Sequence, residues 1–286
     1  MIKINKLSNI IGSEIWNIDL SRSVIPSVFE MIKDVFFSSH FLVFKKQNLS
    51  PKQFVNFSKL FGELDIHVKN VYHHVEYPEI LVLSNKKNIN GKPLGFEDAG
   101  RYWHSDMSYA KIPPMASILY ATDIPDHGGD TYFCNMEQAY NDLDLKEKEF
   151  LKTLKAIHSY EASFQGITSA NKNRGKLTLD QKKQLNEVIH PVIRTHNQTK
   201  RKSIYVNPGF TKGIENRDEN EGKLILSKIY KHCLNQKYIF NHKWEKNDLV
   251  IWDNSSVLHH ATEYDKSQTR HMLRTTIKGS APYYRD

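Results

Sequence analysis

Two residues with metal-binding side chains stand close together in the middle of the chain, in the segment that runs from Tyr102 to Tyr109. His104 offers an imidazole and Asp106 a carboxylate, and both groups are common metal ligands. On a β-strand, residues i and i+2 point to the same face, so a strand here would present His104 and Asp106 side by side. Because a lone His-x-Asp triplet occurs often by chance, a third ligand is needed before it indicates a metal site.

A third candidate ligand lies near the end of the chain, where the apolar run Leu249–Trp252 precedes the pair His259-His260. Consecutive residues of a strand point to opposite faces, so only one of these two histidines can join His104 and Asp106. Two imidazoles and one carboxylate on one side of a metal leave positions open, which suits non-haem Fe(II) that must hold an oxidisable co-substrate and O₂ together. Zinc would favour a closed tetrahedral set. The pattern therefore predicts an Fe(II) site.

Two arginines follow the histidine pair, Arg270 and Arg274. At positions i and i+4 of a strand they share a face, so both can point toward the metal. A guanidinium stays protonated and grips a carboxylate with two parallel hydrogen bonds. Behind a metal triad, we interpret the pair as anchors for a dianionic co-substrate or an acidic substrate rather than as exposed residues of an edge strand.

Taken together, these motifs resemble those of the taurine dioxygenase and 2,4-dichlorophenoxyacetate dioxygenase family of Fe(II)/2-oxoglutarate-dependent oxygenases. The resemblance covers the chain from about Phe36 to Tyr283. In chain order it is carried by Trp103–Asp106, Gly128–Thr131, Tyr205–Phe210, Trp252–Asn254, His259, Arg270 and Arg274. The order and spacing of the motifs, rather than any one of them, make the resemblance specific.

The resemblance implies which residues hold the metal. In the family the distal histidine follows the tryptophan of a Trp-Asp-Asn tripeptide by seven positions, which here selects His259 over His260. Fe(II) would then be bound by His104, Asp106 and His259.

The resemblance also implies how the co-substrate and the substrate are held. Thr131 and Arg270 fall at the positions that bind 2-oxoglutarate, with Arg270 on its distal carboxylate. Arg274 and His67 fall where an anionic group of the primary substrate is held.

Three positions depart from the family pattern. Ser255 follows Trp-Asp-Asn where the family commonly has an arginine, so we expect a peripheral salt bridge to be lost. Gly100 stands in place of an asparagine that contacts substrate in taurine enzymes, and about Asn70 stands in place of their substrate-side tyrosine. Taurine is therefore not the expected substrate.

The expected reaction is the oxidation of a C–H bond of a small anionic organic molecule, most simply its hydroxylation, with release of succinate and CO₂. The same residues would serve desaturation or multi-step oxidation of an amino-acid-derived metabolite, so those outcomes stay open. Asp106 argues against a halogenase, because its carboxylate fills the position that a halide would need. A non-catalytic binding module that keeps the fold is the alternative outside enzymes.

The elements around these motifs predict a mainly β fold with flanking helices and a double-stranded β-helix core of the jelly-roll, cupin-like type. Short β-rich runs separated by turn residues recur along the chain, for example at 80–83, 117–120 and 274–277. Periodic apolar residues predict helices at 25–36 and after Ser50-Pro51, and helical insertions at about 137–154 and 219–234. We expect a single domain over 1–286, with a loop or lid at 163–183.

Composition sets the remaining expectations. The chain has 286 residues and a formal net charge of +8, but its basic residues are not interleaved with an aromatic platform, so we expect no nucleic-acid partner. Two distant cysteines and the absence of a long apolar run predict a cytoplasmic protein without a membrane partner. Relatives are often dimers or tetramers, so we expect a possible homo-oligomer.

Overall fold

The computed structural model describes residues 1–66, 70–97, 100–162 and 186–286. The expected substrate residue His67 and the expected lid at 163–183 lie outside these ranges. Both therefore stay predictions.

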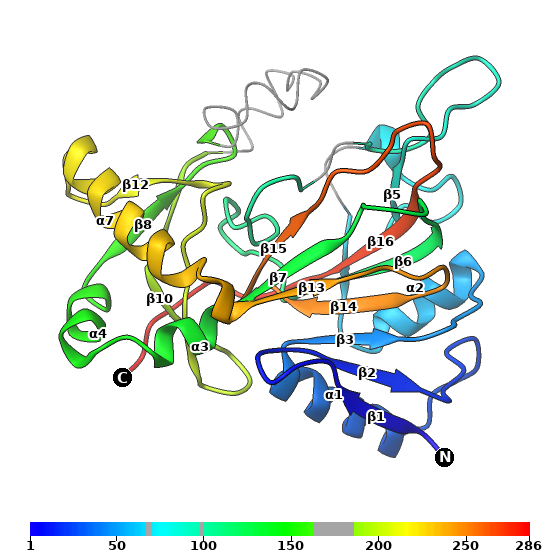
Figure 1. Ribbon diagram of the computed structural model, residues 1–286, viewed down its shortest axis with the longest axis horizontal. Helices are drawn as coiled ribbons and strands as arrows, with labels where there is room; N and C mark the ends of the chain where they lie inside the picture. Colours follow the sequence, from blue (N-terminus) through cyan, green and yellow to red (C-terminus); the bar gives the residue numbers. More distant parts are fainter. Residues whose placement is uncertain (67–69, 98–99, 163–185) are drawn as a thin grey trace.

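The largest sheet has eight strands, which cross the right-hand part of the molecule in Figure 1. Their order is β1 (Lys3–Lys6), β2 (Ser13–Trp16), β3 (Phe41–Phe44), β14 (Leu249–Asp253), β6 (Ala116–Asp123), β16 (His271–Ile277) and β4 (Leu64–Asp65), with β5 (Leu81–Ser84) also paired to β16. All pairings are antiparallel except that of β2 with β3. The central strands β14 and β6 come from distant parts of the sequence, so the sheet forms only when the whole chain folds.

A second sheet of three antiparallel strands packs on one face of the first. It consists of β13 (Ile239–His242), β7 (Thr131–Asn135) and β15 (Val257–Ala261). Apolar side chains of both sheets meet in a shared core, in which the rings of Phe41 and Phe133 stack at 4.5 Å between centroids. The prediction of a mainly β fold with a jelly-roll core is confirmed.

Helices α1 (Pro26–Ser39) and α2 (Pro51–Lys59) cover the other face of the large sheet. Ser50 caps α2 as expected, since its side chain accepts a hydrogen bond from the Gln53 backbone while the Gln53 side chain accepts one from the Ser50 backbone. The buried faces of the two helices, including Phe36 and Phe54, pack on the strands. Both predicted helices are confirmed.

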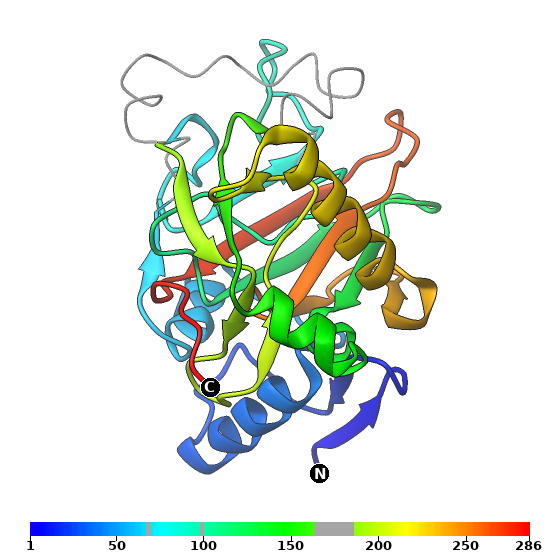
Figure 2. The same cartoon turned by 90° about the vertical axis from the view of Figure 1, so that its left-hand side faces the viewer.

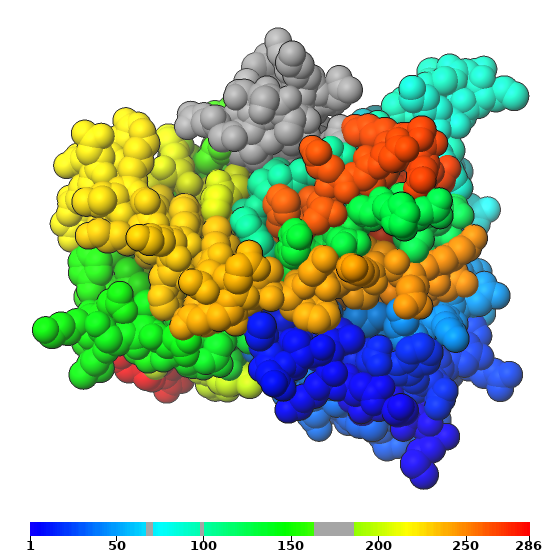
Figure 3. Space-filling view, viewed as in Figure 1, coloured from blue at the N-terminus to red at the C-terminus, as the bar shows by residue number. Residues whose placement is uncertain are grey.

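A third unit lies beside the two sheets, at the left of Figures 1 and 3. It contains the sheet β12 (Thr211–Ile214), β8 (Lys155–His158), β9 (Val188–Pro191) and the hairpin β10 (Ile193–Thr195) with β11 (Lys202–Ile204). Helices α3 (Met136–Asn141), α4 (Leu145–Leu151) and α7 (Glu219–Cys233) pack around them, and Figure 2 shows α7 crossing the front of this unit. Short 3₁₀ turns occupy Asn70–Tyr72 and Gln236–Tyr238.

The helical insertion expected at about 137–154 is confirmed, and it consists of the two short helices α3 and α4. Asn135 caps α3, and a second cap at Asp144 begins α4, where Asp144 and Glu147 form a capping box. The helix expected at 219–234 is confirmed as α7, which begins after its cap Asp218.

No helix within the described ranges is long and apolar enough to cross a membrane. Cys134 and Cys233 are both buried free thiols, and the Cys134 thiol donates to the Cys233 carbonyl at 3.0 Å.

Candidate active site

His104 and Asp106 meet His259 between the two sheets, although His259 is distant from them in sequence. All three are buried, and their candidate ligand atoms lie within 4.8 Å of one another. His259 is on β15, and its backbone exchanges two hydrogen bonds with that of His104, at 2.8 and 3.1 Å. This bridge brings the two imidazole rings to 4.1 Å between centroids.

The expected strand through His104 and Asp106 is not present. His104 makes only the isolated bridge with His259, and the chain then turns at Met107, which has a φ of 47°. Asn207 holds this turn, because its side-chain amide donates to the hydroxyl of Ser108 at 3.0 Å. The imidazole of His104 and the carboxylate of Asp106 still lie on the same side, close to one another.

Hydrogen bonding fixes the orientation of the His104 ring. Its Nδ1 lies 2.8 Å from the carbonyl oxygen of Tyr102, and a carbonyl only accepts, so Nδ1 donates this hydrogen bond and Nε2 is the nitrogen that faces Asp106. That Nε2 lies 3.6 Å from Oδ1 of Asp106, and Nε2 of His259 lies 3.8 Å from the same oxygen. Burial and the neighbouring His104 hold the pKa of His259 well below its usual value, so its ring is neutral. Two imidazole nitrogens and a carboxylate oxygen thus converge, which fits a divalent metal ion.

Asp106 is ionised although it is buried. Burial by itself would raise its pKa, but the Arg274 guanidinium and the two imidazoles hold the pKa well below its usual range. Nη2 of Arg274 lies 3.0 Å from Oδ1 of Asp106, and the hydroxyl of Ser117 donates to Oδ2 at 2.6 Å. Arg274 thus lies directly beside the candidate metal site, with its Nε buried and without a hydrogen-bond partner among the described residues.

His260 faces away from the cluster, as strand alternation predicts. Its ring lies 5.6 Å from that of Trp103 and 6.2 Å from that of Tyr132. The register of β15 therefore leaves His259, rather than His260, beside Asp106.

Arg270 is a buried cation without a carboxylate partner in the described part of the chain. It is 9% exposed, and burial lowers the pKa of its guanidinium to about 10. The side chain lies against Gly129, where a Cβ atom would stand 3.3 Å from Nε of Arg270, and its guanidinium carbon lies 5.8 Å from the centre of the Tyr264 ring. A cation kept in such surroundings is suited to receive an anionic ligand.

Arg270 and Arg274 are not on one regular strand, contrary to expectation. β16 begins at His271, and its register with β6 shifts between His271 and Met272. The two arginines contact different groups, since Arg274 pairs with Asp106 whereas Arg270 lies beside Gly129.

Thr131 is buried at the start of β7, two residues after Gly129. Its hydroxyl accepts a hydrogen bond from the indole Nε1 of Trp244 at 3.0 Å. Because an indole nitrogen only donates, the proton of the Thr131 hydroxyl stays available for an acceptor. The glycine-rich motif thus places a hydroxyl donor and room for Arg270 in one short segment.

Aromatic side chains surround His104 on its other side. The rings of Tyr102 and Phe210 lie 4.9 and 5.9 Å from its imidazole, and the Tyr109 ring lies 4.8 Å from that of Phe210. A Cβ atom at Gly209 would stand 2.5 Å from the Tyr102 ring, so this position needs glycine. The Tyr205–Phe210 motif therefore supports the segment that carries His104.

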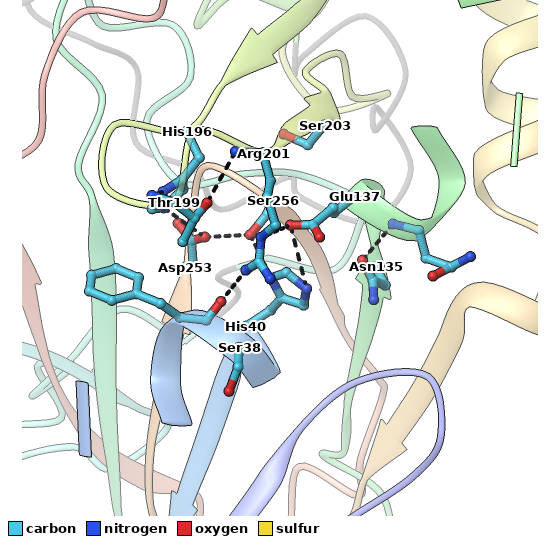
Figure 4. Close-up of polar contacts among 12 residues, drawn as sticks. Ser38, His40, Asn135, Glu137, His196, Thr199, Arg201, Ser203, Asp253 and Ser256 are labelled. Carbon is cyan, nitrogen blue, oxygen red and sulfur yellow. Dashed lines mark hydrogen bonds and ion pairs between the residues drawn. The ribbon is translucent and has the colours of Figure 1, made fainter. Parts of the chain in front are cut away.

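A buried polar network lies beside Asp253, the middle residue of the Trp-Asp-Asn motif (Figure 4). Its carboxylate lies 3.2 Å from Nε2 of His196 and accepts from the Ser256 hydroxyl, which lies 3.1 Å from Nδ1 of His40. Ser255, where the family commonly has arginine, is itself buried. Asp253 thus contacts the imidazole of His196, in the loop between β10 and β11, and the hydroxyl of Ser256.

Sequence reasoning missed Ser117, Asn254 and Trp244 as parts of this site. Ser117 and Trp244 stand in no recognisable motif, and Asn254 was noted only as part of a motif. Ser117 contacts Asp106, Trp244 contacts Thr131 and Asn254 contacts Ser117, all between residues far apart in sequence, so residue spacing carries no signal for them.

A jelly-roll sandwich with two histidines, one carboxylate and two buried arginines nearby defines a class of protein, the metal-dependent oxygenases that use an acidic co-substrate. The chain matches the family described as taurine catabolism dioxygenase TauD, TfdA family over residues 3–276. It therefore belongs to this family, and it is a dioxygenase that uses Fe(II), 2-oxoglutarate and O₂.

Individual relatives agree with this assignment. The chain is 30% identical over 275 residues to an alpha-ketoglutarate-dependent 2,4-dichlorophenoxyacetate dioxygenase of Burkholderia sp. (strain RASC), covering 92% of this chain and 90% of the relative. It is 27% identical to an alpha-ketoglutarate-dependent sulfonate dioxygenase of Saccharomyces cerevisiae, covering 98% of this chain and 68% of the relative. The solved structure of AAD-2 in complex with Mn(II) and N-oxalylglycine superimposes with a TM-score of 0.83 and 27% identity, covering 99% and 100% of the two chains.

Proposed function

We propose that this enzyme hydroxylates a C–H bond of a small anionic organic molecule, with His104, Asp106 and His259 as the ligands of Fe(II). The observation that carries the proposal is the convergence of three lone-pair donors within 4.8 Å in a buried site that also holds two arginines. When bound, the iron supplies the activation of O₂. In the balanced reaction, substrate, 2-oxoglutarate and O₂ yield hydroxylated substrate, succinate and CO₂.

Arg270 and Thr131 are proposed to bind the distal carboxylate of 2-oxoglutarate. Arg270 is a buried guanidinium without a carboxylate partner among the described residues, and the Thr131 hydroxyl has a proton to donate. Both are donors that a carboxylate can satisfy, and both belong to the segments around Gly129. A carboxylate held there would leave the other end of 2-oxoglutarate free for the metal.

Arg274 is proposed to bind the anionic group of the primary substrate. Its Nη2 is paired with Asp106, but its buried Nε is free to donate. This places a cation beside the metal ligands, so an anionic substrate bound there would lie next to the iron. The relatives that act on phenoxyacetates and sulfonates by name support an anionic substrate, a carboxylate or a sulfonate. His67 remains a second proposed contact to that group.

Anaerobic addition of Fe(II) and 2-oxoglutarate tests the site directly, because their complex has a visible charge-transfer band. We expect the band in the wild-type protein and its loss in Asp106→Ala, together with the loss of succinate formation in air. Full succinate production by Asp106→Ala would show that the metal lies elsewhere.

A screen of organic acids, amino acids, sulfonates and aryloxy acids for substrate-dependent succinate release tests the substrate class. Arg274→Ala should raise the substrate concentration required and leave the charge-transfer band in place. A product analysis of the best substrate separates hydroxylation from desaturation, since only the former adds an oxygen atom.

A further inference from the structure

The two carboxylate oxygens of Asp106 have different surroundings. Oδ1 faces Nε2 of both histidines and Nη2 of Arg274, at 3.6, 3.8 and 3.0 Å. Oδ2 instead accepts the hydroxyl proton of Ser117 at 2.6 Å. One oxygen therefore faces the candidate metal site and the other is occupied by a serine.

The hydrogen bonds behind Ser117 run in one direction. The indole Nε1 of Trp252 only donates, and it lies 3.1 Å from Oδ1 of Asn254, which fixes the orientation of that amide. The amide nitrogen of Asn254 then donates to the Ser117 hydroxyl at 3.2 Å, so Ser117 must give its own proton to Asp106. The four residues of this hydrogen-bonded series, Trp252, Asn254, Ser117 and Asp106, are all buried, with at most 3% of the surface of each exposed.

These residues stand on a rigid part of the fold. Ser117 lies on β6, where it pairs with Trp252 of β14 on one side and with Thr276 of β16 on the other. Asp106 instead lies outside the strands, beside the turn at Met107. The side chain of Asp106 is thus oriented by a contact with the sheet.

We propose that Ser117 is a positioning residue that keeps Oδ2 of Asp106 away from the metal, so that the carboxylate binds iron through Oδ1 alone, and that Asn254 holds Ser117 in this role. The proposal rests on the function proposed above. A carboxylate that offered both oxygens would fill a position that 2-oxoglutarate and O₂ require. Ser117 therefore keeps three coordination positions open.

The test compares Ser117→Ala with a matched control, Ser58→Ala. Ser58 is also fully buried, and its hydroxyl makes a 2.8 Å contact with Thr275 that does not involve Asp106. We expect Ser117→Ala to weaken Fe(II) binding, measured by anaerobic titration, by about 10- to 100-fold, as is usual when a partner of a metal ligand is removed. The charge-transfer band should also shift and require more 2-oxoglutarate. Ser58→Ala should bind Fe(II) and 2-oxoglutarate like the wild type.

A second pair of variants separates the hydroxyl from packing. Ser117→Thr and Ser117→Val add the same bulk, but only the first keeps a hydroxyl. If Ser117→Ala does not fold, restored Fe(II) affinity in Ser117→Thr and weak affinity in Ser117→Val would support the proposal. Equal affinity in this pair, or unchanged affinity and band in Ser117→Ala, would overturn it. Failure of the wild-type protein to bind Fe(II) would instead overturn the proposed function, and this inference with it.

Discussion

Arg270→Met is the most informative single change, because it separates the effect of the buried guanidinium on protein stability from its effect on 2-oxoglutarate binding. Methionine has a similar length and no charge, so it fills the space beside Gly129 without a guanidinium. Lowering of the Arg270 pKa to about 10 by burial corresponds to roughly 3 kcal/mol of unfavourable free energy in the protein without ligand. We therefore expect the metal-free variant to unfold at the same temperature as the wild type, or higher.

The same change should be costly for 2-oxoglutarate. A hydrogen bond to a charged group contributes about 1.5–3 kcal/mol, so loss of the Arg270 contact should raise the half-saturating 2-oxoglutarate concentration by about 10- to 150-fold. Titration of the anaerobic Fe(II) complex, followed by the charge-transfer band, measures this value. The stabilisation against thermal unfolding that 2-oxoglutarate confers should decline in parallel.

Arg274→Met provides the contrast. Arg274 is paired with Asp106, so its removal leaves a buried carboxylate without that partner and should destabilise the metal-free protein by about 3–5 kcal/mol. An unchanged 2-oxoglutarate requirement in Arg270→Met would refute the proposed anchor. If Arg270→Met lost as much stability as Arg274→Met, the conclusion that Arg270 has no carboxylate partner among the described residues would be refuted.

Three further predictions concern other parts of the protein. His259→Ala should lose Fe(II) in an anaerobic titration whereas His260→Ala should retain it, because only His259 faces Asp106; the opposite result would reverse the register of β15. Gly100→Ala should weaken Fe(II) binding, since Gly100 has a φ of 76° and a Cβ atom there would stand 2.9 Å from Cε1 of the His104 ring. The control Gly213→Ala should bind Fe(II) like the wild type, because a Cβ atom at Gly213 would meet nothing within 4 Å. Equal Fe(II) affinities of the two variants would contradict this prediction. Burial lowers the folded-state pKa of His40 and His190 to about 4 and that of His158 to about 3. Below pH 6.5 the unfolded chain therefore binds more protons at these histidines than the folded protein does. The free energy of unfolding should fall by up to about 1.4 kcal/mol per histidine for each pH unit between 6.5 and 4. Urea unfolding at pH 7 and 5.5 measures this loss, and equal stabilities would show that these histidines are not buried as neutral rings.

Sequence alone was sufficient for the class of the fold and for the family. β-rich runs between turn residues indicated a mainly β sandwich, and the strands β5, β6, β14 and β16 lie where such runs were noted. Motif order indicated the dioxygenase family, which the comparisons confirm. These features depend on residue type and spacing, which the chain carries without any folding.

Only the tertiary structure decided how the side chains of the site are oriented. The strand expected through His104 and Asp106 is instead a loop that turns at Met107, and Arg274 contacts Asp106 whereas Arg270 lies beside Gly129. Ser117 reaches Asp106 because β6 passes beneath the turn, a contact that no local pattern encodes. Sequence therefore determined which chemical groups are present, whereas packing between distant strands determined which atom of each group faces the site. The reason is that hydrogen-bond direction and side-chain orientation depend on neighbours that only folding brings together.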